Sequence, residues 1–105
     1  MTAHGIELDS PAVREFCQKW NVQELNVFGS ILRDDFRPDS DVDFLVVFAP
    51  GKDPDFLGIS HMEEELGSII GRSVQIVERS CVEKSPNYIR RRHILATAER
   101  LYAQR

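Results

Sequence analysis

The feature that most constrains the fold is the segment SDVDFLVVF, residues 40–48, in which five consecutive apolar residues follow an Asp-x-Asp pair. Beyond Asp43 the apolar side chains do not alternate with polar ones, a pattern typical of a strand that is buried on both faces. Such a strand lies in the middle of a sheet that helices cover. The charges of Asp41 and Asp43 therefore either lie at a solvated end of this strand or bind a ligand.

The flanking segments predict an alternation of helices and strands. Strands are predicted at 22–28 and 73–78, and a helix of about two turns at 30–37, ahead of Pro38. One longer helix is predicted to begin at Pro11 with Ser10 as N-cap, and another lies within 57–71 with Gly71 as C-cap. A third helix is predicted to begin at Pro86 with Ser85 as N-cap, and its apolar stripe reaches Tyr102. This order predicts an α/β (α+β) fold with a small mixed sheet of three to four strands flanked by helices.

Length and charge limit the possible functions. A chain of 105 residues builds one domain, residues 1–105, around one modest core. Because 17 acidic residues outnumber 13 basic ones, nothing global indicates binding to nucleic acid or to an anionic membrane. No leader or membrane-spanning stretch is recognisable, and we expect a cytoplasmic protein. The distant Cys17 and Cys81 are expected to be reduced, with Cys17 in the core.

The two aspartates have the spacing of a metal site. Residues two apart in a strand project from the same face, with α-carbons about 6 to 7 Å apart. Carboxylates so placed can share Mg²⁺ or flank a pair of ions, as in phosphoryl and nucleotidyl transfer. Upstream, Gly29 allows a phosphate to approach the backbone closely, and Ser30 can donate from its amide and hydroxyl. Arg33 can reach the same phosphates as a charge clamp.

Each half of this pattern also has an ordinary explanation. A Gly-Ser pair is most often only a turn, and Asp-x-Asp before a strand is usually a solvated strand end. The two patterns together are much more specific, because a predicted strand precedes the Gly-Ser pair and a buried strand follows the first aspartate of the Asp-x-Asp pair. The stretch resembles the nucleotidyltransferase signature of the DNA polymerase β superfamily, and its form FGS..R......SDVDFLVVF is similar to the minimal nucleotidyltransferases, which are small stand-alone domains.

The resemblance implies a function for the site. Gly29 and Ser30 would hold the triphosphate of ATP, Ser40 would support the loop or a phosphate, and Asp41 and Asp43 would bind Mg²⁺ as the catalytic pair. Members of the family transfer a nucleoside monophosphate, often AMP, to a hydroxyl and release pyrophosphate. Many minimal members resemble antitoxins that form hetero-oligomers with a HEPN-type toxin, which some inactivate by attaching AMP to a tyrosine. A homodimer is the other assembly that we consider.

One position departs from the family pattern. The superfamily uses a third carboxylate on a neighbouring strand, and the corresponding segment here, VQIV, carries Gln75. Gln75 faces the layer where the aspartates should lie, but an amide cannot act as a base. Glu78 would face the opposite side unless the strand bulges. The protein is therefore expected to be a slow or partner-completed enzyme, or an inactive homologue that neutralises its toxin by binding.

Other polar residues have plainer interpretations. Asp34 replaces a glycine that is common in the family, and Asp tolerates unusual backbone angles. The arginines of the segment YIRRRH, residues 88–93, are interpreted as a solvated face, or else as a docking surface for an acidic partner or nucleic acid. His4, His61 and His93 are treated as ordinary surface residues. A small-molecule nucleotidyltransferase is disfavoured because the chain leaves little room for an acceptor domain.

Overall fold

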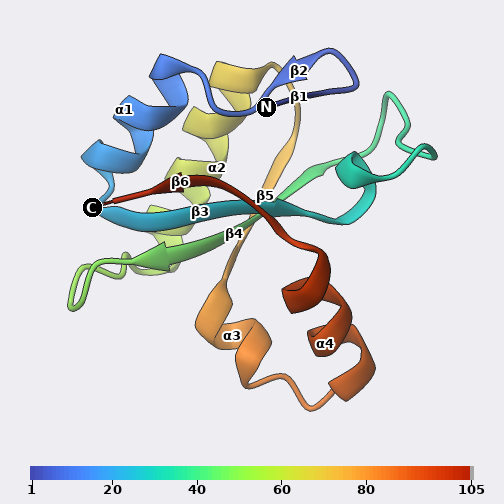
Figure 1. Cartoon of the computed structure of the whole chain (residues 1–105). Helices are drawn as coiled ribbons and strands as arrows, with labels where there is room; N and C mark the ends of the chain where they lie inside the picture. The colour runs from blue at the N-terminus through green and yellow to red at the C-terminus, as the bar shows by residue number, and fades with distance from the viewer. Residues whose placement is uncertain (105) are drawn as a thin grey trace.

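The fold is a four-stranded mixed sheet with helices on both faces (Figure 1). The computed structural model describes residues 1–104. In chain order the elements are β1 (Thr2–Ala3), β2 (Ile6–Glu7), α1 (Pro11–Lys19), β3 (Val22–Phe28), the 3₁₀ helix η1 (Gly29–Leu32), β4 (Val42–Phe48), α2 (Phe56–Ile70), β5 (Val74–Glu78), α3 (Arg79–Glu83), α4 (Tyr88–Thr97) and β6 (Glu99–Ala103). Helices α1 and α2 cover one face of the sheet, and α3 and α4 lie on the other.

The order of the strands in the sheet is β5-β4-β3-β6. Strand β3 is antiparallel to both of its neighbours, and β4 is parallel to β5. The predicted central strand is therefore confirmed as β4. Its side chains are buried on both faces, with Phe44 packed towards α1 and α2 and Leu45 packed towards α3 and α4. The predicted fold class is confirmed as well.

The core has two parts, one on each face of the sheet. The larger cluster joins α1 and α2 to the sheet and includes Val13, Phe16 and Met62. The smaller cluster consists of Phe28, Leu45, Val82 and Ile94. Cys17 is buried in the larger cluster, as predicted, and burial raises the pKa of its thiol to about 12.

Several local predictions are confirmed by the backbone. The hydroxyl of Ser10 accepts a hydrogen bond from the Val13 amide at 3.4 Å, which caps α1 as expected. Strand β3 has the predicted bounds, and Gly71 ends α2 in the left-handed conformation at φ +75°. In these segments the capping and turn residues and the hydrophobic pattern predict the same helix and strand bounds, so the local sequence agrees with the fold.

The predicted helix at 30–37 is wrong. The helical part is only the 3₁₀ turn η1, and Arg33 is already extended at φ −115° and ψ 163°. The following residues form a loop that reaches β4, and side chains from distant parts of the chain hold it. Tertiary contacts therefore decide the conformation of this segment, whose helical signal is short.

The last predicted helix is correct only in its middle. Helix α4 begins after Asn87, whose side chain accepts a hydrogen bond from the Arg90 amide at 3.1 Å, so Ser85 is not its N-cap. The helix ends at Thr97, and the segment Glu99–Ala103 pairs with β3 instead of continuing the stripe. This pairing covers the backbone groups of β3 that would otherwise form an open edge.

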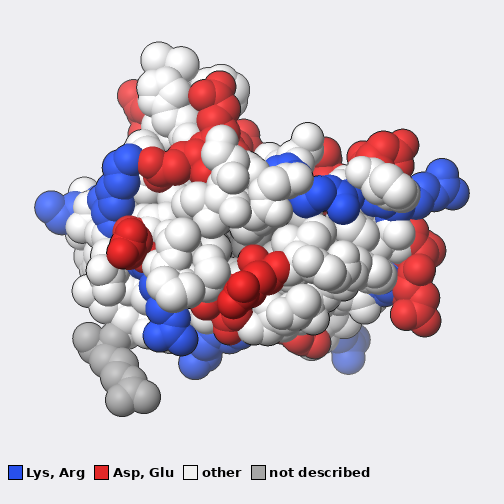
Figure 2. Space-filling model, turned by 90° about the horizontal axis from the view of Figure 1, so that it is seen from above, with Lys and Arg blue, Asp and Glu red and all other residues white. Residues whose placement is uncertain are grey.

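Charges of both signs are interspersed on the face of the molecule seen from above in Figure 2. Basic and acidic side chains alternate there with uncharged ones, and no broad basic field covers this face. Within residues 1–104, no helix combines the length and the apolar character that crossing a membrane requires.

Candidate active site

The turn after β3 lies against a carboxylate of β4. Phe28, the last residue of β3, is directly opposite Asp43 in the antiparallel pair, so Gly29 follows at the edge of the Asp43 side chain. Gly29 has φ +82°, and a Cβ added to it would lie 2.6 Å from Oδ2 of Asp43. Glycine is therefore required here for its backbone angle and for the space that the carboxylate occupies.

The two aspartates differ in their surroundings. Strand β4 begins at Val42, so Asp41 lies just before the strand and is exposed, whereas Asp43 is half-buried within it. The strand predicted from residue 40 thus begins two residues later, with Asp41 next to its first residue. Burial raises the pKa of Asp43 above its usual value, and the charge of Asp41 raises it further, while Arg90 and Arg33 oppose these effects. Asp43 is therefore close enough to Asp41 and to both guanidinium groups for their charges to affect its ionisation.

A cavity of about 300 Å³ joins the glycine turn to α4. Its lining consists of Phe28, Gly29, Ser30, Arg33, Asp43, Arg90, His93, Ile94 and Thr97. The predicted phosphate residues Gly29, Ser30 and Arg33 thus lie in one cavity with Asp43. Asp41 and Ser40 are outside this lining, in the loop that leads to β4.

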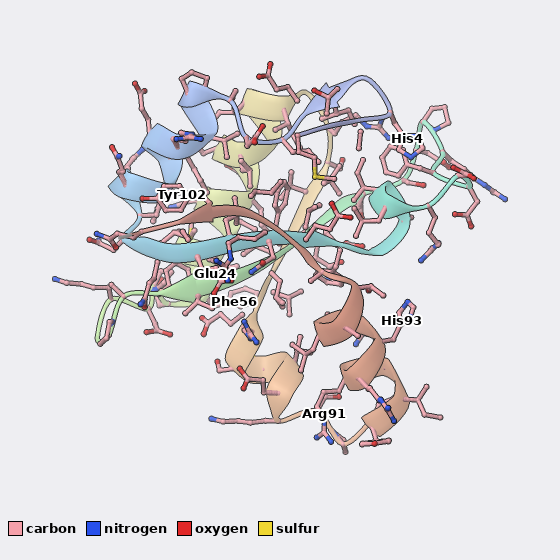
Figure 3. The ribbon with its side chains drawn as sticks, in the orientation of Figure 1. His4, Glu24, Phe56, Arg91, His93 and Tyr102 are labelled. Atoms are coloured by element: carbon pink, nitrogen blue, oxygen red, sulfur yellow. The ribbon has the colours of Figure 1, made fainter. Side chains whose placement is uncertain are left out.

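Helix α4 supplies the part of the site that the sequence interpretation missed. Arg90 and His93 are exposed, as expected, and in addition they line the cavity together with Thr97. Figure 3 shows the His93 side chain projecting from α4. Residues 90, 93 and 97 recur at three- and four-residue spacing, which places them along one side of a helix. That spacing, next to the buried Ile94, is the signal that could have identified them.

Ser40 and Arg33 also make contacts within the loop. The hydroxyl of Ser40 accepts a hydrogen bond from the Arg37 amide at 3.0 Å, so Ser40 supports the turn just before Asp41. Arg33 is exposed, and its Nε lies 3.1 Å from Oδ1 of Asp35. An exposed pair of this kind is weak, so the guanidinium of Arg33 is available to a stronger anion.

Strand β5 places Gln75 next to Asp43. The parallel register pairs Asp43 with Gln75, so both side chains face the same side of the sheet, as predicted. The same register pairs Glu78 with Val46, about 10 Å further along the strand, without a bulge. The alternative in which Glu78 replaces the third carboxylate is therefore wrong. Among residues 1–104, no group of three or more His, Cys, Asp and Glu side chains is arranged to hold a metal ion.

The donor set fits a divalent cation bound together with phosphates. Asp41 and Asp43 offer the hard oxygen ligands that Mg²⁺ prefers, and two carboxylates are enough when substrate phosphates and water complete the coordination. Burial, and after it the charge of Asp41, raises the pKa of Asp43, and a bound cation would favour the ionised carboxylate. A mixed sheet that carries a glycine turn against such a pair defines a protein of the phosphoryl- or nucleotidyl-transfer class.

Comparison with known proteins identifies the family within this class. The sequence profile of the nucleotidyltransferase domain family matches residues 11–97, and the chain belongs to this family. It is 36% identical over 83 residues to the protein adenylyltransferase MntA of Thermococcus cleftensis, a match that covers 79% of this chain and 74% of the relative.

Solved structures share the fold. A structure of a protein assigned to the minimal nucleotidyltransferases is 30% identical, has a TM-score of 0.62, and matches 87% of this chain and 85% of its own. A crystal structure of a toxin–antitoxin with AMP-PNP gives a TM-score of 0.69 at 15% identity, covering 93% of this chain and 76% of the matched one. The second similarity concerns the fold alone.

Proposed function

We propose that this protein is a cytoplasmic antitoxin that transfers AMP from Mg²⁺-ATP to a hydroxyl, a tyrosine in the first instance, of a HEPN-type toxin. The observation that carries the proposal is the approach of Asp43 to the Gly29 turn, because a glycine turn leaves room for a phosphate beside a carboxylate. The name of the relative from Thermococcus cleftensis, protein adenylyltransferase, supports AMP transfer to a protein. A complex of the same fold contains a tri-AMPylated HEPN toxin, which supports the kind of partner.

Different residues of the site bind different parts of the nucleotide–metal complex. The backbone and hydroxyl of Ser30 donate hydrogen bonds to phosphate oxygens, and Gly29 leaves room for them. Arg33 and Arg90 attract the triphosphate, since both line the cavity and carry positive charge. Asp41 and Asp43 would hold Mg²⁺, which, when bound, neutralises phosphate charge and orients the leaving pyrophosphate.

Gln75 limits the rate of the proposed reaction. It faces the same side of the sheet as Asp43, where a third carboxylate would accept the proton of the attacking hydroxyl. An amide cannot accept that proton, so transfer proceeds without general-base assistance, typically worth about 10² to 10⁴-fold, unless the partner supplies a base. This residue favours a second candidate function, neutralisation of the toxin by binding alone.

Neutralisation of the toxin in cells separates the two functions. The test compares wild type with the double variant Asp41→Asn/Asp43→Asn, and Asp39→Asn serves as the matched control because Asp39 is an exposed carboxylate of the same loop. Transfer predicts that the double variant fails to neutralise the toxin although it still binds it, whereas Asp39→Asn protects normally. Full protection by the double variant would rule out transfer and establish the binding function.

A further inference from the structure

The loop between η1 and β4 carries Asp41 but has little structure of its own. Residues 33–41 belong to no helix or strand. Within this segment the Ser40 amide donates to the Arg37 carbonyl at 3.0 Å, the Arg37 amide donates to the Ser40 hydroxyl at 3.0 Å, and the exposed Arg33 side chain donates to Asp35. A short loop with few hydrogen bonds of its own opens easily unless other segments hold it. The position of Asp41 therefore depends on contacts made from outside the loop.

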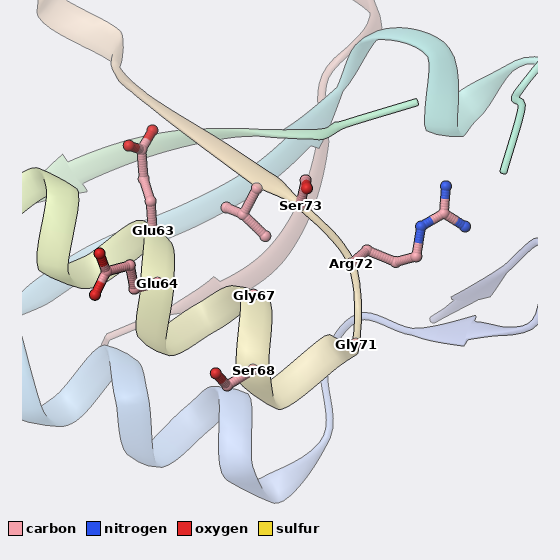
Figure 4. A pocket seen from close by; sticks show the side chains of 8 residues that line it. Glu63, Glu64, Gly67, Ser68, Gly71, Arg72 and Ser73 are labelled. Atoms are coloured by element: carbon pink, nitrogen blue, oxygen red, sulfur yellow. The ribbon is translucent and has the colours of Figure 1, made fainter. Parts of the chain in front are cut away.

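Arg72 makes the most extensive of these contacts. It lies between the C-cap Gly71 of α2 and strand β5, and Figure 4 shows its side chain extending away from Glu63 and Glu64. Its Nη2 donates to three carbonyl oxygens of the loop, those of Arg37 at 2.8 Å, Pro38 at 3.0 Å and Ser40 at 3.1 Å. A guanidinium suits this task because its donors are fixed in one plane and remain charged.

Phe36 gives the loop a second attachment. The Arg72 guanidinium lies 4.6 Å from the centre of the Phe36 ring, in a cation–π contact. The His4 ring stacks on the same phenyl ring with centres 4.9 Å apart, and its Nε2 lies 2.8 Å from the carbonyl oxygen of Arg33. Figure 3 shows His4 beside this loop, at the tip of the N-terminal hairpin. The loop is thus held at both of its ends.

The backbone beside Arg72 is also joined to the aspartates. The amide of Val42, which lies between Asp41 and Asp43, donates to the carbonyl of Ser73 at 2.9 Å. Arg72 and Ser73 therefore fix the residues on both sides of Asp41, from Arg37 to Val42. Asp43 needs no such support, because it is paired on both sides within the sheet.

We propose that Arg72 is a positioning residue that sets Asp41 relative to Asp43 for binding of Mg²⁺ and nucleotide. The effect of Arg72 on Mg²⁺ and nucleotide binding rests on the proposed function, whereas its effect on the conformation of the loop does not. Without the guanidinium, three carbonyls lose a charged donor and Phe36 loses one of its two partners. Asp41 then moves while Asp43 stays, so the protein binds Mg²⁺ less tightly although its fold is intact.

The structural part is tested by hydrogen exchange of the loop amides. Arg72→Met keeps much of the apolar stem and removes the donors. Arg79→Met is the matched control because the guanidinium of Arg79 pairs with carboxylates, those of Glu24 and Glu83. We expect exchange at Arg37 and Ser40 to be at least about tenfold faster in Arg72→Met and unchanged in Arg79→Met, the size of effect typical of hydrogen bonds to charged groups. Equal exchange in both variants would overturn the proposal.

The functional part is tested by the Mg²⁺ dependence of AMP transfer. We expect Arg72→Met to require about tenfold more Mg²⁺ for half-maximal transfer and to keep its rate at saturating Mg²⁺, and Arg72→Lys to lie between it and wild type. A lower rate at every Mg²⁺ concentration with an unchanged half-saturation point would make Arg72 merely structural and refute the proposal. If wild type transfers no AMP, the proposed function fails, and the exchange experiment still decides the role of Arg72 in the loop.

Discussion

Replacing Gly29 with alanine should displace Asp43 from the site. At φ +82° an alanine costs about 1–2 kcal/mol relative to glycine, because its Cβ crowds the backbone. In addition, the new Cβ would lie 2.6 Å from Oδ2 of Asp43, well inside contact distance, whereas Cγ of Asp43 is 3.5 Å away. The Asp43 carboxylate can relieve the clash by rotating, so this second effect moves a metal ligand and adds little to the loss of stability.

Gly51 provides a control with the same backbone strain and no clash. Its φ is +74°, and no atom lies within 4 Å of the position of its Cβ. Both Gly29→Ala and Gly51→Ala should therefore lower the free energy of unfolding by about 1–2 kcal/mol, equivalent to a fall in Tm of about 5 to 15 °C in a domain of this size.

The two variants should differ in nucleotide binding. Calorimetric titration with ATP in the presence of Mg²⁺ should show an affinity for Gly29→Ala at least about tenfold below that of Gly51→Ala, since loss of a charged ligand costs more than about 1.4 kcal/mol. Thermal unfolding without nucleotide measures the shared strain. Equal affinities in the two variants would refute the argument that the space beside Gly29 serves the Asp43 carboxylate.

Three further changes test separate parts of the site. Gln75→Asp should raise the initial rate of AMP transfer, by up to about 10² to 10⁴-fold, because residue 75 faces the same side as Asp43; an unchanged rate in a folded variant would contradict this placement. Asp43 has a raised pKa in the folded state, so its ionisation destabilises the fold as pH rises above its ordinary value of 3.8. Without metal, Asp43→Asn should therefore be more stable than wild type to urea at pH 7, and this difference in stability should vanish below pH 3.8. A difference that stays constant with pH would refute the raised pKa of Asp43. Arg90→Met should weaken ATP binding more than Arg92→Met, which alters an arginine outside the cavity lining, and equal titration curves would exclude Arg90 from the site.

The central strands and the glycine turn were predictable because their signals are local. The run from Phe44 to Phe48 is apolar at every position, and Gly29 interrupts a β-branched and aromatic segment. The side of the sheet that Gln75 faces was also accessible, since alternation along the strand turns Gln75 away from the side that Val74 and Ile76 face. These features need no knowledge of distant contacts.

The other half of the site depends on tertiary contacts that local signals do not specify. Leu101 and Tyr102 fit an apolar helical stripe as well as a strand, and only the free side of β3 selects the strand. Arg90 and His93 acquire a role because α4 and η1 line the same cavity. The hydrogen bond from Arg72 to the Arg37 carbonyl joins residues 35 positions apart, so residue spacing gives no indication of it.

Transfer of label from α-labelled ATP to the purified partner toxin, with Mg²⁺, is the measurement that addresses the proposed activity most directly. Wild type should label the toxin on a tyrosine, and Asp41→Asn/Asp43→Asn should not, although both proteins bind it. Absence of label with wild type, while the toxin remains bound and silenced by both proteins, would contradict nucleotidyl transfer and show that the fold neutralises its partner by binding.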